Sequence, residues 1–176
     1  MKKVFLGFLF LFINCNISLG SITINFLPEF VGYILLIIAL KELNVQNKNF
    51  DKAKPIVGIM CVFSVVFFFI NLFNVFSSNL AMIGFVFSAF LVLGALYVTY
   101  YIVLGIIDIE METQVDLAGD KLYVRWKDNA FVQVASFVCL FIPFVNLLAM
   151  LVSIFTAFML VFAAYKTSVL YNTANM

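Results

Sequence analysis

The chain between Asn25 and Leu43 reads Asn-Phe-Leu-Pro-Glu-Phe-Val-Gly-Tyr-Ile-Leu-Leu-Ile-Ile-Ala-Leu-Lys-Glu-Leu. A polar turn opens directly into an apolar helix, and Glu29 stands at the junction as the first acidic residue of the sequence. Pro28 suits the first turn of a helix, where its missing N–H is not needed, and Asn25 is a suitable N-cap. A helix that is apolar around its whole circumference needs an apolar surrounding, so this stretch predicts a membrane-embedded segment.

The composition of the whole chain predicts the same environment. Hydrophobic residues make up 65% of the 176 positions and charged residues 11%, whereas a soluble domain is about 45–50% apolar and about 25% charged. The excess apolar surface must face lipid, and the continuous apolar runs indicate helices rather than the alternating strands of a barrel. We therefore predict one domain, residues 1–176, with an all-α fold: a polytopic transmembrane helical bundle.

Apolar runs long enough for a bilayer crossing divide most simply into six helices. The first and fifth are short for a full crossing, so either of the hairpins to which they belong could be re-entrant. The start of the chain also has the form of a secretory signal, but Asn14 is a poor residue before Cys15 for lipoprotein cleavage, and we interpret the segment as a retained first helix. The expected helices lie at about 4–20, 27–43, 56–76, 80–108, 130–142 and 146–166.

Basic residues give the expected sidedness. With six crossings, every Lys and Arg falls on one face. These residues lie before the first helix and after the second, fourth and sixth helices. The positive-inside rule then makes that face cytoplasmic and both termini cytoplasmic, with the lipid bilayer as the main partner. The largest segment on this face is a loop at about 109–129, in which one apolar side could form a surface helix or the whole could be a plain loop; the apolar side consists of Val115, Ala118, Leu122 and Trp126.

Polar residues collect at the opposite face on this topology. A carboxylate in hydrocarbon costs several kcal/mol, so Glu29 is expected to face protein or water. We interpret the group as an outward-open polar cleft for a cation or polar solute; the alternative is ordinary interface polarity, with Glu29 favoured by the helix dipole. The amides expected beside Glu29 are Asn25, Asn71, Asn74 and Asn146.

A second polar group lies at the end of the fourth predicted helix. Asp108, Glu112 and Asp116 follow one another at a spacing of four, with Glu110 nearby. If the helix continued, three carboxylates would line one face near its negative end and would need a cation, so these residues are a candidate metal site. The alternative is that the acids are solvated or meet Lys121 and Arg125.

Small residues recur at packing spacing on two helices. Such faces let membrane helices approach closely, within one chain, between two copies of it, or against another membrane protein. The expected packing residues are Gly84, Ser88, Ala149, Ser153 and Ala157.

Motifs for catalysis, cofactors and nucleic acid are missing from the sequence. Histidine is absent, Cys15, Cys61 and Cys139 are far apart, and there is no phosphate-binding glycine loop or nucleophile elbow. There is also no basic patch of the nucleic-acid-binding type. We therefore expect no cofactor and no nucleic-acid partner, and a function that is more simply non-enzymatic.

The run Leu27-Pro-Glu-Phe-Val-Gly-Tyr33, with Phe50-Asp-Lys-Ala53 after it, resembles a motif of a family of small, uncharacterised polytopic bacterial membrane proteins. In that family Leu-Pro-Asp-Phe-Ile-Gly-Tyr opens the second helix. The resemblance covers the first third of the chain and implies a bacterial plasma-membrane protein, without an activity. The six-helix frame is also similar to substrate-capturing subunits of energy-coupling-factor vitamin transporters, although only Gly7 stands where those carry an Ala-x-x-x-Ala face.

Three functions follow from these patterns. The first is an accessory or solute-binding and transport subunit with its site near Glu29. The second is a protective or regulatory protein that packs against a partner through its small-residue faces. The third is a lipid-modifying enzyme with a divalent cation at Asp108, Glu110 and Glu112.

Overall fold

The structure, a computed structural model, describes residues 1–13, 16–19, 22–25, 28–43, 48–72, 81–139 and 143–174. These residues form six helices and one two-stranded hairpin, so the predicted helical bundle is confirmed with an added hairpin. The elements in chain order are α1 (Lys2–Phe12), β1 (Asn16–Leu19), β2 (Ile22–Asn25), α2 (Glu29–Glu42), α3 (Lys48–Leu72), α4 (Ala81–Thr113), α5 (Gly119–Cys139) and α6 (Pro143–Ala174).

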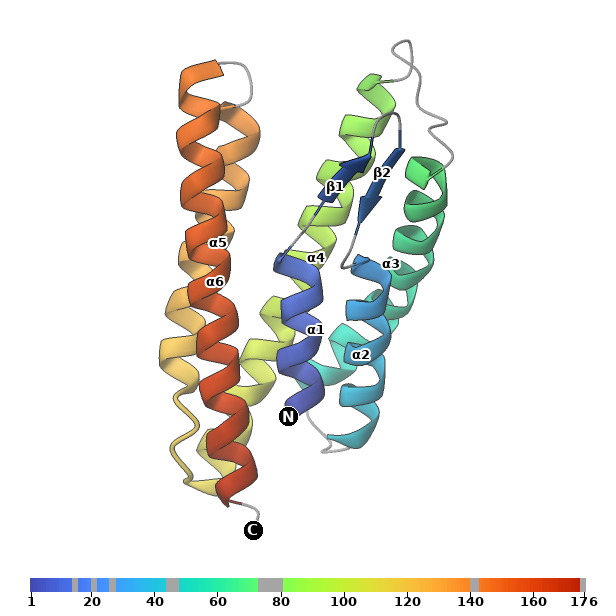
Figure 1. Cartoon of the computed structure of the whole chain (residues 1–176). Coiled ribbons are helices and arrows are strands. Elements are labelled where there is room, and N and C mark those ends of the chain that lie inside the picture. The colour runs from blue at the N-terminus through green and yellow to red at the C-terminus, as the bar shows by residue number, and fades with distance from the viewer. Residues whose placement is uncertain are drawn as a thin grey trace.

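The six helices form a closed ring. Each helix packs against the next along the chain, and α1 packs against α6 (Figure 1). The buried core runs through the ring and includes Phe8, Leu36, Met60, Ile102 and Leu160. The N-terminal end of α1 and the C-terminal end of α6 lie toward the same end of the molecule (Figure 1).

The prediction of one helix over residues 4–20 is wrong. α1 ends at Phe12, and the chain then forms an antiparallel hairpin in which Asn16 pairs with Asn25 and Leu19 with Ile22. The asparagines and the Ile-Ser-Leu and Ile-Thr-Ile runs favour strands over helix, because β-branched residues lose side-chain freedom in a helix. The hairpin lies beyond the ends of α1 and α2, and β2 contacts α3 (Figure 1).

The third helix begins earlier than predicted. It was expected to begin at about residue 56, but α3 starts at Lys48 and contains Pro55. The turn before the proline is held by burial and a hydrogen bond: Phe50 and Ala53 are buried, and Asn49 Nδ2 donates to Asp108 Oδ2 at 2.7 Å. These contacts offset the backbone hydrogen bond that proline cannot make.

The predicted loop at 109–129 is mostly helical. α4 continues to Thr113 and α5 begins at Gly119, so Val115 and Ala118 lie in a short turn while Leu122 and Trp126 belong to α5. The prediction of a separate surface helix in this segment is therefore wrong. Packing explains why this segment folds against the bundle, because Leu117 and Leu122 are buried in the core. Glu110 Oε2 also stabilises the turn by accepting a hydrogen bond from the Gly119 N–H at 2.7 Å.

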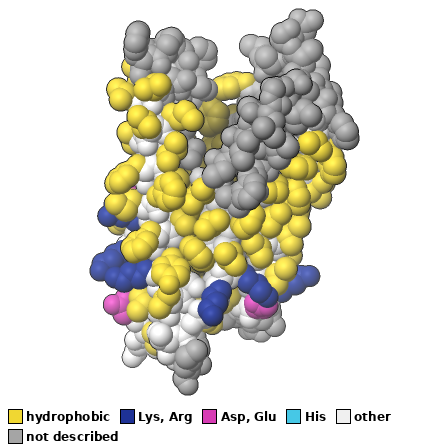
Figure 2. All heavy atoms as spheres, viewed as in Figure 1, with side chains coloured by type: hydrophobic (Ala, Val, Ile, Leu, Met, Phe, Trp, Pro, Cys, Tyr) yellow, Lys and Arg dark blue, Asp and Glu magenta, His cyan; other side chains and the backbone are white. Residues whose placement is uncertain are grey.

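Three helical stretches of the described residues are long and apolar enough to cross a membrane: Lys48–Leu72, Ile83–Thr113 and Leu147–Ala174. Their surfaces carry many exposed large apolar side chains, among them Phe69, Phe90 and Phe155. On the face drawn in Figure 2, Lys and Arg side chains gather in a band in the lower part of the molecule, and hydrophobic side chains cover most of the described surface above it.

Candidate functional site

Glu29 is the first residue of α2 and is half-buried. Pro28 precedes it in an extended conformation, at φ −68° and ψ 129°, and sets the direction in which the helix starts. The 14 residues of α2 place Glu29 about 20 Å along the helix axis from the end that carries Lys41 and Glu42. The carboxylate therefore lies far from the band of basic side chains.

Glu29 and Gln133 line the same small cavity. Its volume is about 60 Å³, and its walls come from α1, α2, α4 and α5. This is room for about two water molecules, or for one small ion. Among the described residues the rest of the lining is apolar, so Glu29 and Gln133 supply the polar side chains of this part of the wall; the apolar residues are Leu11, Phe12, Leu91, Val92 and Ala95.

Contacts between α4 and α5 close the bundle on both sides of this cavity. Toward the far ends of the two helices, the rings of Phe85 and Phe137 meet edge to face, with centroids 5.7 Å apart. Toward the basic end, the Trp126 indole N–H donates a hydrogen bond to Thr99 Oγ1 at 3.0 Å. The site is thus built into the interior of the bundle and not on its rim.

A polar row on α5 leads from the basic end to the cavity. Trp126, Asn129 and Gln133 are spaced three and four residues apart and share one face of the helix. Asn129 is fully buried; its Oδ1 accepts a hydrogen bond from Thr156 Oγ1 of α6 at 3.3 Å, and its Nδ2 has no partner among the described residues. Buried polar side chains in an apolar bundle usually serve packing specificity or a ligand path.

A second buried polar group lies next to Glu29 on α2. Tyr33 follows Glu29 by one helical turn and is fully buried, and its hydroxyl has no hydrogen-bond partner in the described part of the chain. The interior of the bundle therefore holds several polar atoms near Glu29, contributed by α2 and α5.

Of the four predicted asparagines, Asn71 is the one whose side chain the structure describes. Asn71 is half-buried in the last turn of α3 and is not among the described residues that line the cavity. Asn74 lies outside the described residues, and the side chains of Asn25 and Asn146 do too. The amide that does line the cavity, Gln133, was missed; its spacing from Trp126 and Asn129 is the signal that would have indicated it.

The acids near the end of α4 have separate partners. Asp108 accepts a hydrogen bond from Asn49, Glu110 from the Gly119 N–H, and Asp116 Oδ1 from the Ala118 N–H at 2.8 Å. Glu112 lines a different cavity of about 140 Å³ beside Tyr171. No group of three or more metal-ligating side chains occurs among the described residues, so the metal site stays a prediction.

The small residues differ in their surroundings. Ala157 is buried in the bundle, beside the Thr156 contact to α5. Ser88 donates a hydrogen bond to the Gly84 carbonyl at 3.0 Å, and both are half-buried, as are Ala149 and Ser153. Ala157 therefore serves packing within the chain, and contact with a partner or a second copy stays a prediction.

Comparison with known proteins gives no relative for this chain. No family model matches it, and neither does any curated protein or any solved structure. The resemblance of residues 27–33 to a bacterial membrane-protein family stays a prediction, and the function has to be inferred from the geometry of the site.

Proposed function

We propose that this chain is a multi-pass, non-enzymatic protein of the bacterial plasma membrane that binds a small inorganic cation at Glu29, as an accessory or transport subunit. The three long apolar helices support the membrane assignment. By the positive-inside rule, the band of basic side chains marks the cytoplasmic face, with both termini on that side.

The observation that carries the proposal is the cavity that Glu29 and Gln133 line together. A carboxylate oxygen and an amide oxygen are the ligands that hard cations prefer. Ionisable residues inside a membrane bundle are expensive to place and commonly mark ion or proton pathways.

The size of the cavity restricts the ligand. Sites for drug-sized molecules have volumes of about 300–1,000 Å³, and this cavity has about 60 Å³. A vitamin-sized solute is too large for it, whereas a monovalent inorganic cation fits. Of the two ligand classes predicted from the sequence, a cation and a polar solute, the size of the cavity favours the cation.

The short helices α1 and α2 support the same interpretation. They have 11 and 14 residues, or about 16 and 21 Å of helix, so both stop about halfway through a hydrocarbon core of about 30 Å. Interrupted helices place ligand sites near the midplane in many transporters. The positive end of the α2 dipole also favours the ionised carboxylate, which is the form that binds a cation.

A thermal-unfolding experiment tests the proposal. The purified chain in detergent is titrated with LiCl, NaCl or KCl, with choline chloride holding the ionic strength constant. A cation that binds only the folded state stabilises it by about 2.7 kcal/mol at a concentration of 100 Kd. We expect at least one of these salts to raise the unfolding temperature of the native chain, and Glu29→Gln to lose this response while it still folds.

Glu42→Gln is the matched control. It removes a carboxylate from the other end of the same helix, where Glu42 pairs with Lys3 at the exposed surface. The control should keep the cation response of the native chain. An equal loss of response in both variants, or an unchanged response in Glu29→Gln, would contradict the cation site.

A further inference from the structure

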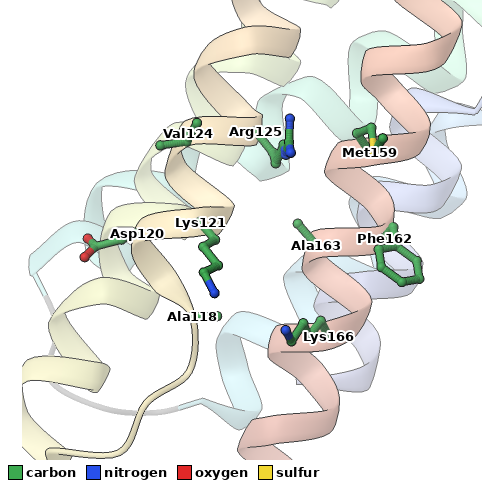
Figure 3. A pocket seen from close by; sticks show the side chains of 9 residues that line it. All are labelled: Ala118, Asp120, Lys121, Val124, Arg125, Met159, Phe162, Ala163 and Lys166. Atoms are coloured by element: carbon green, nitrogen blue, oxygen red, sulfur yellow. The ribbon is translucent and has the colours of Figure 1, made fainter.

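A groove separates the start of α5 from the second half of α6. Its volume is about 570 Å³, about ten times that of the Glu29 cavity, and none of its lining residues is shared with that cavity. Figure 3 shows the side chains of both helices around it. The lining consists of Ala118, Asp120, Lys121, Val124, Arg125, Met159, Phe162, Ala163 and Lys166.

Three cations converge on this groove from two helices. Lys121 and Arg125 stand one turn apart on α5 and lie in the gap between the helices, Lys166 comes from α6, and Asp120 points away from the gap (Figure 3). Arg125 forms an exposed ion pair with Asp128 at 3.6 Å, and neither lysine pairs with an acid in the part of the chain that the structure describes. The groove therefore carries net positive charge and has room for an anion.

The wall between these cations is apolar and continues into the outer surface of α6. Val124, Met159 and Phe162 line the groove, and Phe162 is 67% exposed. Phe158 and Phe155 extend this exposed apolar surface along α6, away from the basic end. A ligand that fits both parts has an anionic head and an apolar chain.

We propose that this groove binds one anionic phospholipid of the surrounding leaflet. The phosphodiester lies between Lys121 and Lys166, with Arg125 beside it, and an acyl chain follows the apolar side of α6 past Phe162. Basic pockets between membrane helices on the cytoplasmic side are suited to anionic head groups. A soluble phosphate would match the cations but would leave the adjoining apolar surface without a partner.

The test measures thermal unfolding of the full chain in detergent against increasing dioleoyl phosphatidylglycerol. Dioleoyl phosphatidylcholine is the lipid without net charge, and inorganic phosphate is the soluble anion. The groove variant is Lys121→Gln/Lys166→Gln, and both lysines are exposed, so the folded state should be retained. The control variant Lys54→Gln/Lys127→Gln removes two exposed lysines that do not line the groove.

We expect phosphatidylglycerol to stabilise the native chain and the control equally. Each charge contributes about fivefold to affinity for an anionic lipid, so the groove variant should need about 25-fold more lipid for the same shift. Ala163→Leu fills the groove without changing its charge and should weaken the response too. An equal loss in both double variants, an equal shift with phosphatidylcholine, a full shift with inorganic phosphate, or an undiminished response in Ala163→Leu would each overturn the proposal.

Discussion

Trp126 is fixed inside the bundle by a polar contact and by aromatic neighbours. Its indole N–H donates to Thr99 Oγ1 at 3.0 Å, and its ring lies 4.9 Å from that of Tyr100 and 6.2 Å from that of Tyr123, measured between centroids. Thr99 is fully buried, and its hydroxyl is also within hydrogen-bond distance of the Ala95 carbonyl, at 2.7 Å. One residue of α4 thus links the backbone of its own helix to α5.

Thr99→Val tests this link while keeping the shape of the side chain. The substitution removes the acceptor of the indole N–H, and hydrogen bonds between membrane helices are worth about 1 kcal/mol. We expect a loss of about that size in the free energy of unfolding, measured by sodium dodecyl sulfate titration, together with altered emission of Trp126, the only tryptophan. Thr173→Val, at an exposed position of α6, should change neither; equal effects of the two substitutions would argue against the link.

Single residues were predictable from the sequence where the chemistry was local. Glu29 stood out because it is an acid at the start of an apolar helix, and the structure lines an internal cavity with it. Gln133 was missed because its role depends on which helices are neighbours, and α5 meets α4 only in the folded ring. The asparagines were grouped with Glu29 because they are expected at the same level of the membrane, and this grouping stays a prediction.

Between helices, close approach depends on glycine at particular contacts. The buried Phe50 ring of α3 lies against Gly105 of α4, where an added Cβ would overlap the ring. Gly58 of α3 has open space around the corresponding position. These two glycines have the same helix propensity but opposite packing surroundings.

Gly105→Ala and Gly58→Ala therefore form a matched pair. Alanine gains up to about 1 kcal/mol over glycine in a helix, but overpacking costs about 1–3 kcal/mol. We expect Gly105→Ala to destabilise the chain by about 1–2 kcal/mol and Gly58→Ala to be neutral or slightly stabilising, in detergent unfolding experiments. Phe50→Leu should partly restore Gly105→Ala; destabilisation by Gly58→Ala alone would speak against this packing.

Element boundaries were less predictable than element positions. Four helices, α2, α3, α4 and α6, were placed correctly from their apolar runs, because such runs need no knowledge of neighbours. The end of α1 at Phe12 and the start of α5 at Gly119 were not predicted. The first is decided by strand pairing after α1, and the second by burial of Leu122 and partial burial of Trp126 in an otherwise charged segment.

At the scale of the whole molecule, charge and apolar surface are separated. The ion pairs Lys3–Glu42, Lys54–Asp51 and Arg125–Asp128 are all exposed, and such pairs add little stability in water. Lys52 lies over the Tyr101 ring, with its Nζ 5.3 Å from the centroid. The basic side chains therefore contribute little as individual stabilising contacts, and we propose that together they mark one membrane face.

The central claim is that the bundle crosses the bilayer with this basic band on the cytoplasmic side, which leaves Glu29 about halfway through. Cysteine labelling in intact cells tests it most directly, in a background where Cys15, Cys61 and Cys139 are replaced by alanine. We predict that Lys54→Cys and Lys127→Cys react with a membrane-impermeant maleimide only after permeabilisation, whereas Ser78→Cys, between α3 and α4, reacts without it. Labelling of Lys54→Cys and Lys127→Cys from opposite sides, or of Ser78→Cys from the same side as both, would contradict the claim.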